Sequence, residues 1–157
     1  MTMIRICNRL FDTHPIAAHC PGPPYDGFTR FHDAVLGQSP KPMRGCSDLT
    51  ILTWNAGLRP AKPTGLLERI LERFGVSPWV LGKGTPNWQN IYKIRLTADA
   101  LEAVTTPFVM GADSSDVVVF DDPAVFVDRF KQHFTSELVF NATGAECWPE
   151  LPEYVHF

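Results

Sequence analysis

The central signal of this chain reads Phe108-Val-Met-Gly-Ala-Asp113-Ser-Ser-Asp116-Val-Val-Val-Phe120, an apolar run that two aspartates interrupt. Its first part, residues 108–110, is typical of a buried strand, and the aspartates follow where that strand ends. In a parallel α/β sheet, ligands bind beyond the carboxyl ends of the strands. Asp113 and Asp116 are therefore expected at a ligand-binding edge.

Strand and helix patterns alternate around this segment. β-rich runs predict further strands at residues 49–54, 79–81 and 138–140. Apolar residues at three- and four-residue steps predict three helices. Their apolar positions are Leu66, Leu67, Ile70, Leu71 and Phe74 after a Thr64 cap; Ile91, Ile94, Ala98 and Leu101; and Val125, Phe126, Phe130 and Phe134 after Asp122 and Pro123, the last four expected to face inward. This order predicts an α/β domain with a mostly parallel sheet.

Composition is that of an ordinary globular domain. The chain has 157 residues, of which 45% are apolar and 20% charged. A formal charge of -3 with scattered basic residues argues against nucleic acid as the main partner. No apolar run of about 18 residues occurs, so no membrane span is expected. The N-terminus lacks a secretory pattern and no Cys-x-x-Cys pair exists, which predicts reduced thiols and a cytoplasmic protein.

Residues 1–48 differ in composition from the rest of the chain because they are rich in proline and glycine. Such a stretch does not sustain long regular elements. We expect one short helix at residues 29–36 and a segment that packs on the domain formed by residues 49–157. The first third also holds Cys7, His14, His19, Cys20, His32 and Cys46. Their spacings match no familiar zinc-ligand pair, which favours ordinary reduced Cys and surface His.

The acid pair suggests metal-assisted chemistry. Two carboxylates at a strand end can hold Mn²⁺ or Mg²⁺, which both prefer oxygen ligands, and the cation can hold a diphosphate. A cation there would neutralise the charge that builds up when a diphosphate leaves, as it does in sugar transfer from a nucleotide sugar. The alternative is structural: one aspartate caps a turn or a helix while the other is solvated.

A series of short motifs surrounds the acid pair in a characteristic order. These are Leu81-Gly82-Lys83-Gly84, Trp88, Lys93, Asp113-Ser-Ser-Asp116-Val117, Phe130-Lys131-Gln132, Leu138-Val-Phe140 and Glu146-Cys147-Trp148-Pro149-Glu150. In order and spacing, roughly residues 49–150 resemble the glycosyltransferase domain of procollagen-lysine hydroxylases and procollagen glycosyltransferases. The resemblance implies a three-layer α/β/α nucleotide-sugar transferase (GT-A-like) fold, a UDP-sugar donor and Mn²⁺.

The resemblance also implies roles for individual residues. Asp113 and Asp116 fall at the metal-binding acids. Thr53, followed by Trp54 and Asn55, lies where the first strand meets the nucleotide, although the family has small residues in place of the last two. Lys93 matches a helix lysine that suits a phosphate, but the family's glycine-rich stretch before it is missing. Trp88, in the loop before that helix, is expected either at the mouth of the site or in the core.

The end of the chain departs from the family, in which a region after Cys-Trp-Pro supplies the acceptor side and a histidine metal ligand. The chain ends at Phe157, and the spacing does not assign that role to His156. Three hypotheses stay open: a minimal or truncated transferase, a transferase completed by a partner chain or a second copy, and an inactive relative that serves as a binding or structural subunit. A further hypothesis is a binding module that docks through its proline-rich segment. The expected partners are a nucleotide sugar and an acceptor, protein or small molecule, that the sequence does not identify.

Overall fold

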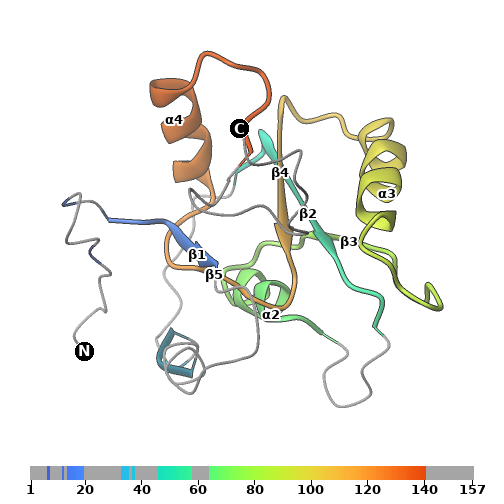
Figure 1. Cartoon of the computed structure of the whole chain (residues 1–157). Coiled ribbons are helices and arrows are strands. Elements are labelled where there is room, and N and C mark those ends of the chain that lie inside the picture. Colours follow the sequence, from blue (N-terminus) through green and yellow to red (C-terminus); the bar gives the residue numbers. More distant parts are fainter. Residues whose placement is uncertain are drawn as a thin grey trace, which may run out of the picture.

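The computed structural model describes residues 7, 12, 14–19, 33–35, 37, 46–57 and 64–140. These residues form mixed helices and strands (Figure 1). In chain order the elements are β1 (Ala17–His19), β2 (Leu49–Trp54), α2 (Leu66–Arg73), β3 (Trp79–Leu81), α3 (Tyr92–Leu101), β4 (Phe108–Asp113), β5 (Val117–Val119) and α4 (Ala124–His133). The predicted strands at 49–54 and 79–81 are confirmed, and the strand predicted at 108–110 continues to Asp113.

A parallel three-stranded sheet forms the centre, in the order β3-β2-β4. Register places Trp54, the last residue of β2, beside Leu81 of β3 and Asp113 of β4. The three strands therefore end together at one edge, as the sequence predicted for a parallel α/β sheet. That edge carries Asp113.

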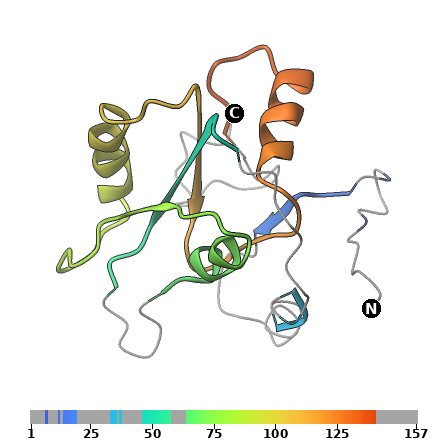
Figure 2. The same cartoon turned by 180° about the vertical axis from the view of Figure 1, so that it is seen from behind.

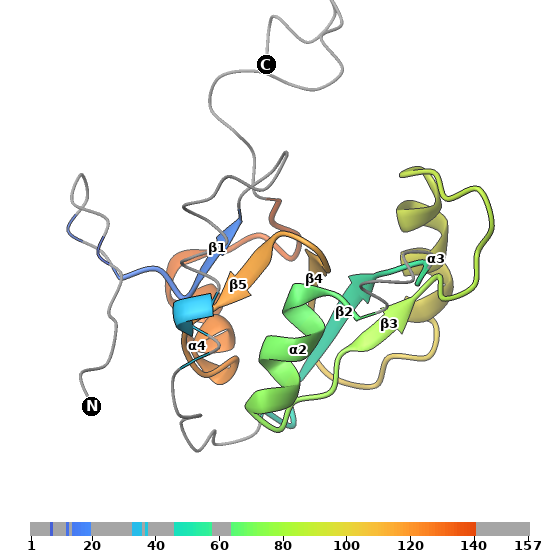
Figure 3. The same ribbon diagram turned by 90° about the horizontal axis from the view of Figure 1, so that it is seen from below.

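Side chains of β2 alternate between the two faces of this sheet. Ile51 packs into the core cluster with α2, whereas the indole nitrogen of Trp54 donates a hydrogen bond to Thr97 of α3 at 3.0 Å. Helices α2 and α3 therefore contact opposite faces of the sheet, and Figures 2 and 3 show the strands between them.

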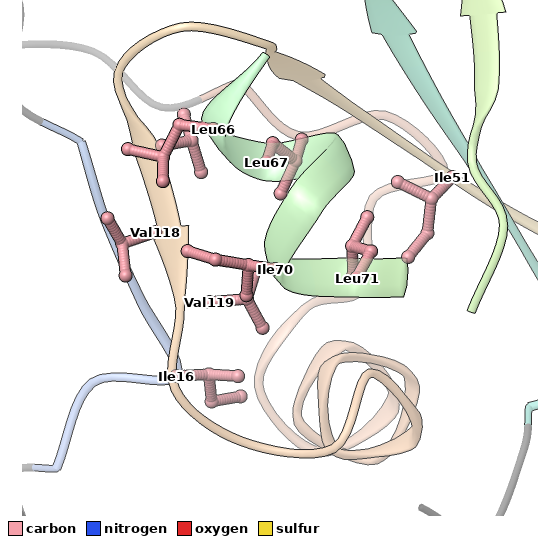
Figure 4. Packing of buried hydrophobic residues seen from close by; sticks show 9 residues of the cluster. Ile16, Ile51, Leu66, Leu67, Ile70, Leu71, Val118 and Val119 are labelled. Carbon is pink, nitrogen blue, oxygen red and sulfur yellow. The ribbon is translucent and has the colours of Figure 1, made fainter. Parts of the chain in front are cut away.

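The main core lies between α2, strand β2 with its Ile51, and the short strands β1 and β5 (Figure 4). Its fully buried members are Leu67, Ile70, Leu71, Val118 and Val119. Strand β1 pairs antiparallel with β5, with Ala18 opposite Val118, and Ile16 enters the same cluster. The pairing brings residues from the proline-rich segment into direct contact with the strand that follows the acid pair.

Helix α2 begins one residue later than the predicted Thr64 cap suggests. Gly65 is the capping residue, and its backbone N–H donates to Glu68 Oε1 at 3.1 Å. Glycine is required there because a Cβ would lie 1.5 Å from Ser114 Oγ. The helix ends before Gly75, whose φ of 74° suits the left-handed conformation that glycine adopts readily.

The apolar stripe whose spacing predicted helix α3 lies on the outside of the molecule. Ile94 is 69% exposed and Ile91 61% exposed. The helix instead presents Lys93 and Thr97 toward the sheet, where these residues bind Asp113 and Trp54. These two polar contacts set the rotation of the helix about its axis, so the periodicity identified the helix but not the side that faces the sheet.

Two predictions near the end of the described chain are wrong. Residues 138–140 are irregular and exposed rather than a strand, because no described strand lies beside them to pair with. Phe134 of the helix predicted after Asp122 is 47% exposed, whereas Val127, which was not singled out, is buried. The start of α4 agrees with the sequence, since the Asp122 carboxylate accepts a hydrogen bond from the Ala124 N–H at 2.9 Å.

Some sequence predictions fall outside the described residues. Of the short helix predicted at 29–36, residues 33–35 are described and helical. The Cys-Trp-Pro segment and His156 lie outside the described ranges, as do Cys20 and His32. No helix in the described part of the chain has both the length and the apolar character that crossing a bilayer requires.

Candidate metal centre

Asp113 and Asp116 are brought together by the turn between β4 and β5. Asp113 is the last residue of β4, and Asp116 directly precedes β5. Ser114, which is 2% exposed, holds this turn in place through its hydrogen bonds to α2. Its hydroxyl donates to Glu68 Oε1 at 2.7 Å, and its carbonyl accepts from the Leu67 N–H at 3.0 Å. The core helix α2 therefore sets the position of both aspartates.

His19 joins the pair from a distant part of the sequence. It is the last residue of β1 and lies opposite Val117, the residue after Asp116. Its Nε2 is 3.2 Å from Asp116 Oδ2. One ligand atom from each of His19, Asp113 and Asp116 can be chosen so that all three lie within 4.8 Å of one another. Within the described ranges these are the His, Cys, Asp or Glu side chains gathered closely enough to share an ion; the described cysteines, Cys7 and Cys46, are not among them.

One oxygen of Asp116 has no hydrogen-bond partner within the described part of the chain. Asp116 Oδ1 is buried, and no donor among the described residues reaches it. An unpaired buried oxygen of a carboxylate is unfavourable, because desolvation of the charge is not offset. A cation beside Asp116 would supply the missing partner, so the donor set and this oxygen both fit a divalent ion.

Among the described residues, Lys93 is the positively charged side chain that contacts Asp113 directly. Its Nζ forms an ion pair with Asp113 Oδ1, and both side chains are about a third exposed. The same ammonium lies 5.5 Å from the centroid of the Trp54 ring, within the range of a cation–π contact. With a neutral His19, two carboxylates and one ammonium leave an excess of one negative charge. The cluster therefore attracts a cation even with Lys93 in place.

Glu68 connects three segments at the carboxyl-terminal edge of the sheet through hydrogen bonds. Its buried Oε1 accepts hydrogen bonds from Asn55 Nδ2 at 2.6 Å, Ser114 Oγ at 2.7 Å and the Gly65 N–H at 3.1 Å. The three donors come from the end of β2, the start of α2 and the acid-bearing turn. Sequence reasoning missed this role; the signal was an acid at the third position of a helix, which is typical of a capping residue.

The residues predicted to bind the nucleotide are separated by the structure. Trp54 and Lys93 lie beside Asp113, on the α3 face of the sheet. Thr53 is fully buried and, by strand alternation, points to the α2 face. Asn55 follows β2 and is held by Glu68, while its own Oδ1 accepts from the Gly57 N–H. These placements make Lys93 and Trp54 the neighbours of the His19, Asp113 and Asp116 cluster.

Trp88 is packed at the start of α3. Its ring lies over Gly82, where a Cβ would approach a ring carbon to 2.5 Å, and it meets Tyr92 edge-to-face at 6.0 Å between centroids. Gly82 has a φ of 81°, so both its conformation and the tryptophan above it require glycine. Trp88 therefore anchors the β3–α3 loop, and its role toward a ligand stays a prediction.

Comparison of the chain with protein-family models, curated proteins and solved structures gives no significant match. The class of the site is accordingly defined by its own geometry. One imidazole and two carboxylates converge at the carboxyl-terminal edge of a parallel sheet, with a lysine alongside. Such a group can bind a divalent cation, and the cation and lysine together can bind a phosphate-bearing ligand.

Proposed function

We propose that this protein is a metal-dependent glycosyltransferase that transfers a sugar from a UDP-sugar, with Mn²⁺ or Mg²⁺ held by Asp113 and Asp116. The observation that carries the proposal is the convergence of these two carboxylates at the end of β4. The sequence resemblance described above supplies the sugar nucleotide and the class of reaction. The proposed fold is a three-layer GT-A-like fold, supported by α2 and α3 on opposite faces of a parallel sheet.

Each residue of the cluster would have a distinct task. Asp113 and Asp116 hold the ion, and the unpaired Asp116 Oδ1 is the atom that gains most from it. Lys93, on α3, is placed to turn from Asp113 toward the phosphates of the donor. The bound ion supplies charge neutralisation of the departing diphosphate. Glu68 keeps the acid-bearing turn at a fixed distance from the end of β2.

The experiment is a thermal-shift titration with UDP and Mn²⁺. Saturation at about 100 times the dissociation constant stabilises a protein by about 2.7 kcal/mol, which raises the melting temperature by several degrees. The double variant Asp113→Asn with Asp116→Asn should lose this rise. Asp128→Asn, which changes an exposed acid on α4, is the matched control and should retain it. An unchanged response in the double variant would refute the proposal.

Trp54 favours one alternative, a catalytically inactive relative that binds nucleotide sugars or serves as a structural subunit. The tryptophan ring stands at the strand end, within contact of Gly111 and below Lys93, where the resemblance places a small residue. Such a ring occupies room that a donor would need. Hydrolysis of UDP-sugars above the level of the Asp113→Asn, Asp116→Asn variant supports the transferase, whereas UDP binding without hydrolysis supports the inactive relative.

A further inference from the structure

We propose that His19 is a third metal ligand and that its imidazole makes the site select a transition-metal ion, such as Mn²⁺, over Mg²⁺ and Ca²⁺. This inference rests on the metal site of the proposed function. It adds a nitrogen donor from β1 to the two carboxylates, and it makes the proline-rich N-terminal segment part of the metal centre.

Strand pairing holds His19 in position. The β1–β5 ladder sets Ala17 opposite Val119 and His19 opposite Val117. Val118 and Val119 of β5 are fully buried in the core, and their packing holds the β1–β5 ladder in place. His19 is thereby fixed one residue along the ladder from Asp116, rather than placed there by a free surface loop.

Distances are compatible with one shared ion. Two ligands bound at about 2.1 Å on opposite sides of an ion are about 4.2 Å apart, and neighbouring ligands are closer. The three ligand atoms already lie within 4.8 Å of one another. Rotations about side-chain bonds that move the atoms by about half an ångström would therefore close the site. The imidazole is 39% exposed, which leaves a path for the ion from solvent.

The mixed donor set decides the choice of ion. Mg²⁺ and Ca²⁺ prefer oxygen ligands, whereas imidazole nitrogen suits Mn²⁺ less strongly than Co²⁺ or Zn²⁺ but better than it suits Mg²⁺. His19 would bind through the Nε2 lone pair, with its proton on Nδ1. The same Nε2 lies 3.2 Å from Asp116 Oδ2, so the imidazole is directed into the cluster.

The test is calorimetric titration of the full-length protein with MnCl₂ and, separately, MgCl₂, without nucleotide. His19→Ala should raise the dissociation constant for Mn²⁺ at least about tenfold, while that for Mg²⁺ changes less than about threefold. His133→Ala, an exposed histidine of α4, should bind both ions as the unmodified protein does. Equal weakening of both ions in His19→Ala, or no weakening, would overturn the inference.

Spin-echo spectroscopy of bound Mn²⁺ gives a readout that a loss of local structure would not imitate. Modulation from a directly bound imidazole ¹⁴N is expected in the unmodified protein and in His133→Ala. His19→Asp keeps a ligand at this position but replaces nitrogen by oxygen, so Mn²⁺ should remain bound without that modulation. Bound Mn²⁺ that shows no nitrogen modulation in the unmodified protein would contradict the role of His19.

The outcomes separate this inference from the proposed function. Binding of Mn²⁺ that depends on His19, together with no response to UDP, supports the metal centre and removes the sugar-nucleotide proposal. A response to UDP and Mn²⁺ that is lost with Asp113 and Asp116 but unaffected by His19→Ala supports the proposed function and removes the inference.

Discussion

The positive charge of Lys93 would have opposite effects on the two proposed ligands of the site, a divalent cation and a diphosphate. The Lys93 ammonium pairs with Asp113, where it competes with a divalent cation for the same carboxylate. A bound diphosphate, in contrast, would gain from a positive charge at this position. In the proposed site the side chain would therefore oppose metal binding when nucleotide is absent and favour binding of the metal-bound nucleotide.

Replacement of Lys93 by Met keeps an unbranched side chain that is one atom shorter and removes its charge. We expect Lys93→Met to bind Mn²⁺ about 3- to 10-fold more tightly, and UDP in saturating Mn²⁺ about 10-fold more weakly, because each lost or gained charge contact is worth roughly 1 kcal/mol. Calorimetric titration measures both constants. Lys83→Met, at an exposed loop position, is the control. A change of both constants in the same direction would show that Lys93 does not mediate between the two ligands.

Helices α2 and α3 look alike in sequence but contribute to the fold differently. Both carry apolar residues at helical spacing, yet those of α2 are buried and the stripe of α3 faces outward. Buried apolar area is what stabilises the folded state. The two helices therefore allow a direct comparison between a buried core leucine and an exposed isoleucine of an apolar stripe.

Leu67→Ala removes a fully buried side chain from the core cluster and should lower the free energy of unfolding by about 3 kcal/mol. Ile94→Ala, at a position 69% exposed, should change it by less than about 0.5 kcal/mol. Urea denaturation followed by circular dichroism measures both values. A loss of more than about 2 kcal/mol in Ile94→Ala would mean that a partner or another part of the chain covers the stripe.

Periodicity and strand composition predicted which elements exist, because both signals are local. Strands at 49–54 and 79–81 and the helix with Leu66 to Leu71 follow from the sequence for this reason. The side of α3 that faces the sheet does not, since the contacts of Lys93 and Thr97 with residues of the sheet set its rotation. Residues 138–140 have the composition of a strand, but composition alone does not provide a neighbouring strand.

At the scale of the whole molecule, the proposed metal centre joins distant parts of the chain. Asp113 and Asp116 were predicted because a turn of two serines brings them together locally. His19 was not, because it reaches the cluster only through the pairing of β1 with β5, nearly a hundred residues away in sequence. No motif at that spacing signals such pairing, so the position of His19 beside the two aspartates could be found only from the folded chain.

The central claim is that one divalent ion binds between these three side chains. Anomalous diffraction from crystals grown with Mn²⁺, collected above and below the manganese absorption edge, locates the ion directly. The account predicts one strong peak within about 2.3 Å of oxygens from Asp113 and Asp116 and of His19 Nε2. A protein that binds Mn²⁺ elsewhere, or shows no peak in this cluster with Lys93 still paired to Asp113, would contradict it.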